Sequence, residues 1–111
     1  MNLQTLEKLV DESYLELGLA TKDYADAAIV LEQKKYTNEI RKAKLMQSGL
    51  IDGKNQSIRD AQLQEAMAKD LDELHQLDMA ESRRKFKMQQ VQIAVDRACA
   101  LLRIAELTEE K

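Results

Sequence analysis

The chain has 111 residues, a net charge of −3 and neither proline nor tryptophan. Glycine occurs three times, aromatic residues make up 4% of the chain and charged residues 33%. This composition excludes most β-sheet folds, because strands need β-branched and aromatic residues and their turns need glycine or proline. It predicts an all-α fold in a single helical domain, 1–111, made of good helix formers with a large solvated surface.

The first predicted element is a helical arm over residues 3–48. Apolar residues at helical spacing form one stripe in its first half and a second stripe in its second half. The stripes consist of Leu3, Leu6, Val10 and Leu17, and of Ala25, Ile29, Tyr36, Ile40, Ala43 and Leu50. Gly18 separates the stripes, and Thr21 can cap a fresh helix behind it. The arm is therefore either one kinked helix or two helices, over 3–17 and 21–48, which would give three helices in all.

A turn is predicted over residues 49–56, where the chain reads GLIDGKNQ. Gly49 fits the left-handed position that closes a helix. The next helix begins either from Asp52 or from Ser57, which opens a sequence resembling a capping box. From residue 57 to residue 108 neither glycine nor proline interrupts the pattern, which predicts one long helix.

Charge alternates in blocks, with net charges of −5 over 1–32, +5 over 34–59, −6 over 60–82 and +5 over 83–103. When the chain folds back at the turn, blocks of opposite charge lie beside each other along both arms. Exposed ion pairs contribute less than about 1 kcal/mol each, so this pattern selects a register more than it supplies stability. The predicted fold is a long antiparallel helical hairpin. The charged residues Asp70, Glu81 and Arg84 interrupt the expected core line, which favours a compact bundle over a uniform coiled coil.

The stretch from Val91 to Leu107 is apolar on more than one helix face. A helix packed on one partner needs a single stripe about 100° wide, so a broader apolar surface predicts a further partner. A second copy of the chain is the expected partner, which gives an oligomeric helical bundle. The predicted oligomer interface comprises Val91, Val95, Ala98, Leu101, Leu102, Ile104 and Ala105. The turn and the acidic 70–81 face are expected to remain free for another protein.

A run of basic residues provides the candidate nucleic-acid-binding site. Its members are Arg83, Arg84, Lys85 and Lys87. Phe86 lies among them and can stack on a base. A second basic patch near the turn comprises Lys34, Lys35, Arg41, Lys42 and Lys44. The sequence pI of about 5.2 is atypical of nucleic-acid-binding proteins, and no helix has the pattern of a membrane-surface binder.

No residue pattern in the chain is typical of an enzyme. Asp72 and the only histidine, His75, have the spacing used in di-iron bundles, but such sites need that motif twice. Cys99 lies in an apolar segment and is expected to be a buried, inert thiol. The sequence predicts no catalytic residue, no metal, no cofactor and no small-molecule substrate. The single cysteine, the absence of a signal-peptide pattern and the absence of long apolar runs predict a cytoplasmic protein.

The segment GLIDGKNQSIRDAQL, followed by AESRRKFKMQQVQIAVDRACALLRIAEL, resembles small helical phage and prophage proteins. The resemblance covers most of the chain and rests on the turn and on the composition of the helices. Such proteins are often encoded among DNA replication and recombination genes, so the resemblance adds support to a DNA-related role, and it assigns no functional residue. The leading hypothesis is a non-enzymatic, oligomeric protein–protein interaction or scaffold protein. The alternative is an accessory DNA-binding protein in phage replication or recombination.

Overall fold

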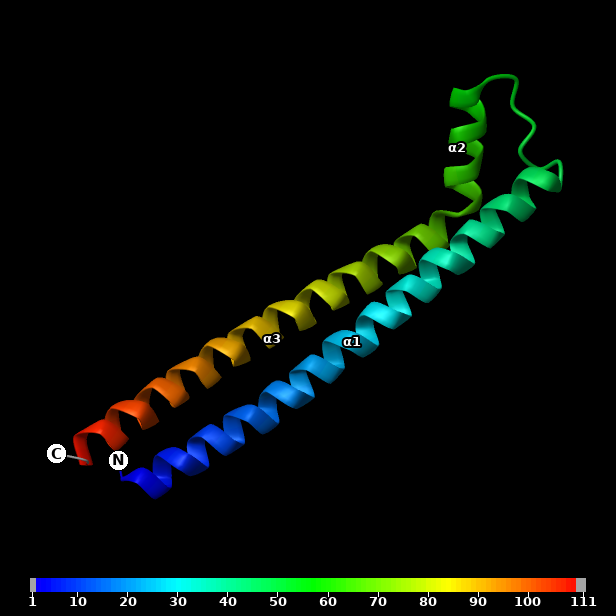
Figure 1. Cartoon of the computed structure of the whole chain (residues 1–111). Coiled ribbons are helices and arrows are strands. Elements are labelled where there is room, and N and C mark those ends of the chain that lie inside the picture. The colour runs from blue at the N-terminus through cyan, green and yellow to red at the C-terminus, as the bar shows by residue number, and fades with distance from the viewer. Residues whose placement is uncertain (1, 110–111) are drawn as a thin grey trace. The chain divides into compact units, whose positions relative to one another are not determined.

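The computed structural model describes residues 2–109, which form three α-helices (Figure 1). Helix α1 spans Leu3–Gln47, α2 spans Gln56–Ala66 and α3 spans Ala68–Glu109. None of the residues in 2–109 belongs to a strand. The predicted all-α class and the antiparallel helical hairpin are therefore confirmed. In this part of the chain, no helix combines the length and the apolar character needed to cross a membrane.

Helix α1 runs through Gly18 as one element, so the alternative of two helices over 3–17 and 21–48 is wrong. Its first turn is capped by Asn2, whose Oδ1 accepts a hydrogen bond from the backbone N–H of Thr5 at 2.8 Å. The helix ends before Gly49, which has a φ of +82° as the sequence predicted. The residue before it, Ser48, donates its hydroxyl to the carbonyl of Leu45 at 2.7 Å and so satisfies one free carbonyl.

The predicted long helix over residues 57–108 is broken at Met67, which separates α2 from α3. α2 leaves α3 at a clear angle, although neither glycine nor proline lies near the break (Figure 1). Packing accounts for this break, because Leu63 and Met67 are 9% and 5% exposed and face the end of α1 beside Lys42. A sequence without helix breakers can still bend where the bend buries apolar side chains.

The start of α2 also differs from both predicted starts, Asp52 and Ser57. Asn55 is the N-cap, and its Oδ1 accepts a hydrogen bond from the N–H of Ile58 at 2.9 Å. An asparagine at this position satisfies a backbone donor as well as serine does. The preceding loop is held by Gln62, which accepts from the N–H of Gly53 at 2.9 Å and donates to Asp52.

The contacts divide the chain into two compact units. One unit contains the chain up to Asp26 and from Ser82 onward, and the other contains Ala27–Glu81. In the first unit the beginning of α1 pairs with the end of α3, and we call it the terminal unit. In the second unit the end of α1 pairs with α2 and the beginning of α3, and we call it the turn unit.

Burial in α1 and α3 follows an alternating spacing of three and four residues, which is the heptad repeat of a coiled coil. The buried and half-buried positions of α1 include Leu6, Val10, Ser13, Leu17, Ala20, Tyr24, Ala27, Leu31, Lys34, Asn38 and Leu45. Those of α3 include Asp70, Leu74, Leu77, Glu81, Met88, Val91, Val95, Ala98, Leu102 and Ala105. As expected, the charged residues Asp70, Glu81 and Arg84 stand on this line in α3, where Asp70 and Glu81 are half-buried and Arg84 is exposed.

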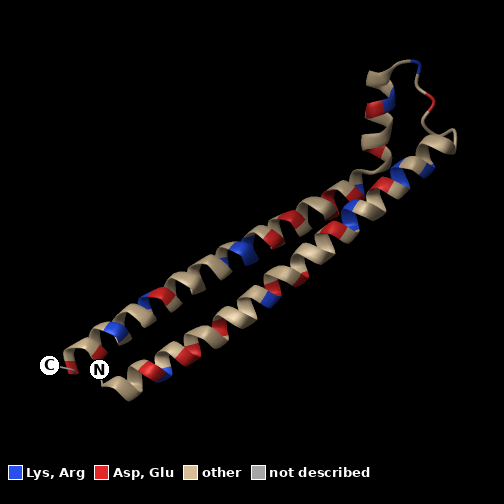
Figure 2. Cartoon of the chain, viewed as in Figure 1, with Lys and Arg blue, Asp and Glu red and all other residues tan. Residues whose placement is uncertain are grey.

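A cluster of charged side chains lies in the seam of the turn unit. The Nζ of Lys34 is 3.0 Å from Asp70 Oδ1 and 2.9 Å from Glu73 Oε2, and Arg41 Nε is 2.9 Å from Asp70 Oδ2. Asn38 is 6% exposed and donates its amide to the carbonyl of Asp70 at 3.4 Å. Figure 2 shows basic residues toward the end of α1 and acidic residues at the start of α3.

This cluster confirms that the basic 34–48 segment pairs with the acidic start of the second arm. It also corrects the expectation that the acidic 70–81 face is free, since Asp70 and Glu73 are engaged by α1. The hydrogen bond from Lys34 lowers the pKa of Asp70 below its ordinary value of 3.8. Hydrogen bonds to Glu73 and Asp70 raise the pKa of Lys34 above 10.5.

We predict opposite effects for two glycine substitutions. Gly18→Ala should raise the free energy of unfolding by about 1 kcal/mol, because nothing lies within 4 Å of the added carbon in a helix interior. Gly49→Ala should lower it by about 1–2 kcal/mol, because Gly49 has a left-handed backbone. Urea unfolding at low protein concentration checks both values. A loss of stability in Gly18→Ala would contradict a continuous α1.

We predict that Asp70→Asn flattens the acid dependence of stability. A lowered pKa in the folded chain means that the unfolded chain binds the proton first as the pH falls. The stabilisation by Asp70 is therefore complete above pH 3.8 and is lost as the pH falls through the lower folded value. Urea unfolding from pH 7 downward should show a steeper loss for the natural chain than for Asp70→Asn. Parallel curves would show that Asp70 is not held as its carboxylate.

Candidate self-association surfaces

The predicted oligomer interface divides into buried and exposed residues. Val91, Val95 and Ala98 are 6%, 1% and 3% exposed in the seam with α1, so a second copy has no access to them. Leu102 and Ala105 are half-buried in the same seam. The remaining two, Leu101 and Ile104, are exposed at 42% and 61%. Three of the seven predicted interface residues thus belong to the core of the chain's own terminal unit.

The exposed apolar residues of α3 form a second stripe on the side opposite to the seam. A residue turns by about 100° around a helix axis, so positions two apart lie on nearly opposite sides. Ile93 lies two residues after Val91 and is 62% exposed, and Ile104 lies two residues after Leu102. We call this stripe the outer face of α3. It comprises Phe86, Ile93, Ala100, Ile104 and Leu107.

The sequence predicted that this helix is apolar on more than one face, but it did not assign Ile93 to a separate stripe. The signal is present, because Phe86, Ile93, Ala100 and Leu107 recur at intervals of seven residues. Such a repeat marks one line along a helix. The sequence alone does not show which of the two apolar stripes of α3 is covered by α1.

Helix α1 also has an outer face in the terminal unit. Its seam positions Ser13 and Ala20 are 9% and 7% exposed. Leu15 on the opposite side is 68% exposed, and Leu19, which is 59% exposed, borders a hollow that Val91 of α3 also lines. We call Leu15 and Leu19 the outer face of α1. Large apolar side chains at such exposure on both sides of a two-helix unit are typical of surfaces that bind other proteins.

The candidate nucleic-acid-binding residues Arg83, Arg84, Lys85 and Lys87 are all exposed. None of the ion pairs found among residues 2–109 involves them. Arg83, Arg84 and Lys87 lie within about 100° of one another around α3, whereas Lys85 points to another side of the helix. In the second patch, Lys34 and Arg41 are neutralised by acidic residues of α3. DNA binding stays a prediction.

Cys99 is half-buried, which corrects the expectation of a fully buried thiol. Its Sγ donates a weak hydrogen bond to the hydroxyl of Tyr14 at 3.8 Å, and this contact joins α3 to α1 in the terminal unit. The bond raises the pKa of Tyr14. Within residues 2–109, no three His, Cys, Asp or Glu side chains are grouped so as to hold a metal ion.

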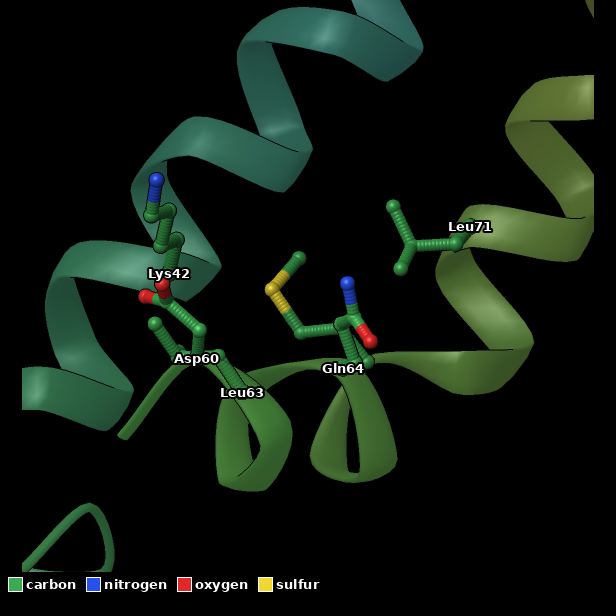
Figure 3. A pocket seen from close by; sticks show the side chains of 6 residues that line it. Lys42, Asp60, Leu63, Gln64 and Leu71 are labelled. Atoms are coloured by element: carbon green, nitrogen blue, oxygen red, sulfur yellow. The ribbon is translucent and has the colours of Figure 1, made fainter. Parts of the chain in front are cut away.

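A hollow with a volume of about 320 Å³ lies in the turn unit between α2, the end of α1 and the start of α3 (Figure 3). Leu63, Met67 and Leu71 form its apolar lining. Lys42 of α1 and Asp60 and Gln64 of α2 complete the lining. This lining contains no serine, cysteine or histidine, so it offers no nucleophile of the common catalytic types.

No protein-family profile, curated protein or solved structure matches this chain significantly.

Proposed function

We propose that this chain is a non-catalytic scaffold protein that assembles with other copies of itself through the outer face of α3. The exposure of Ile93 and Ile104, on a helix whose opposite face is already buried, carries the proposal. Removing such side chains from water contributes about 1.5–3 kcal/mol each, which favours association. The unpaired Cys99 is consistent with a reducing compartment, so we place the assembly in the cytoplasm.

A second copy is favoured as the partner because the terminal unit itself contains helices of opposite charge. The part of α1 up to Asp26 carries six acidic residues and two lysines, whereas α3 from Ser82 to Glu109 carries six basic and three acidic residues. The acidic part of α1 in one copy can therefore pair with the basic part of α3 in another copy. Such complementarity speeds encounter and selects partners.

We predict that Ile104→Glu weakens self-association at least about tenfold, because a charge would be buried without a partner at the interface. The helical content should not change, since Ile104 is 61% exposed within the chain. Leu102 is less suitable for this test because it is half-buried in the seam. Sedimentation velocity over a range of concentrations gives the dissociation constant.

The matched control is Val30→Glu, which makes the same kind of change at a residue that is 45% exposed. Val30 lies in the turn unit and outside both outer faces, so its variant should associate like the natural chain. Equal association by all three chains would remove the outer face of α3 as the interface.

A further inference from the structure

We infer that the self-association is heterologous: the outer face of α3 in one copy packs on the outer face of α1 in the next copy. This inference rests on the proposed function and names the surface that the outer face of α3 recognises. A heterologous contact joins two different faces, whereas a two-fold contact joins a face to itself.

The terminal unit has the geometry that such a contact needs. The outer face of α3, represented by Ile93, lies on one side of the helix pair, and Leu15 lies on the other. Each is directed away from the seam, because it lies two positions from the buried residues Val91 and Ser13. One copy can therefore accept a neighbour on each side without moving its own helices.

The charges favour a contact between the outer face of α3 and the outer face of α1 over a two-fold contact between two outer faces of α3. On the outer side of α3, Arg97 lies between Ile93 and Ile104, about one turn after the first and about two turns before the second. Two such faces would bring arginines together, and like charges across an interface cost free energy. The outer face of α1 is bordered by Asp11, Glu12 and Asp26 and by only two basic residues, Lys8 and Lys22, so its net charge is negative.

The lysines of α1 do not reverse that charge. Lys8 pairs with Glu12 at 3.9 Å and Lys22 pairs with Asp26 at 3.6 Å, both within α1. Asp11 is exposed, and none of the ion pairs found in residues 2–109 involves it. A basic face of α3 packed on this face of α1 brings charges of opposite sign together between copies.

A heterologous contact leaves one α1 face and one α3 face free at the ends of every dimer. Further copies can add until a ring closes or a chain grows. The natural protein is then expected to exceed a dimer as its concentration rises, and to do so less at high salt, because salt screens the charge pairing.

A mixing experiment separates the two modes. Leu15→Glu blocks the outer face of α1, and Ile104→Glu blocks the outer face of α3. Each variant alone should remain at 12.7 kDa, because it lacks one of the two faces that the contact joins. An equimolar mixture should form a dimer of twice that mass and no larger species, since the only remaining contact uses the intact α3 of the first variant and the intact α1 of the second. Light scattering after size exclusion gives these masses.

Each outcome decides a different point. If Leu15→Glu still dimerises alone while Ile104→Glu does not, the contact is two-fold through α3, and the heterologous inference is overturned with the proposed function intact. If both variants associate like the natural chain, the proposed function itself fails. Leu15→Ser and Ile104→Ser repeat the test without added charge, and circular dichroism confirms that every variant remains helical.

Discussion

Two helices packed side by side can bury only one stripe of each, and this constraint governs the terminal unit. Its seam is narrow and contains small residues such as Ser13, Ala20 and Ala98, which let the helices approach closely but bury little area each. The apolar residues of α3 exceed what this seam can hold. Ile93 and Ile104 consequently face water in a single copy, and the proposed assembly follows from that imbalance.

In the turn unit the same two long helices also bury only one stripe each. Charged residues occupy part of this seam, and a third helix, α2, packs beside it. Lys34, Arg41 and Asp70 occupy or border the heptad seam and satisfy one another. A charged cluster at such positions adds little net stability, because desolvation offsets most of the attraction, but it penalises every other register. The bend at Met67 lets α2 bury Leu63 against the end of α1.

The sequence was sufficient to predict the features that depend on local chemistry. The absence of proline predicted long helices, Gly49 predicted the end of α1, and the charge blocks predicted the pairing in the turn unit. The sequence did not predict features that depend on which helix, or which copy of the chain, covers a given apolar surface. No glycine or proline lies near the bend at Met67. The apolar stripe through Val95 has the same sequence pattern whether α1 or another copy covers it. Burial in the folded chain was needed to assign Val95 to the core and Ile93 to the outer face.

The central claim is that one copy of this chain leaves an apolar helix face without a partner and that another copy covers it. Sedimentation equilibrium of the natural chain across a wide concentration range tests this claim most directly. The account predicts an average mass that rises well above 12.7 kDa as concentration increases. A fully helical chain that stays at the mass of one copy at every concentration would contradict it.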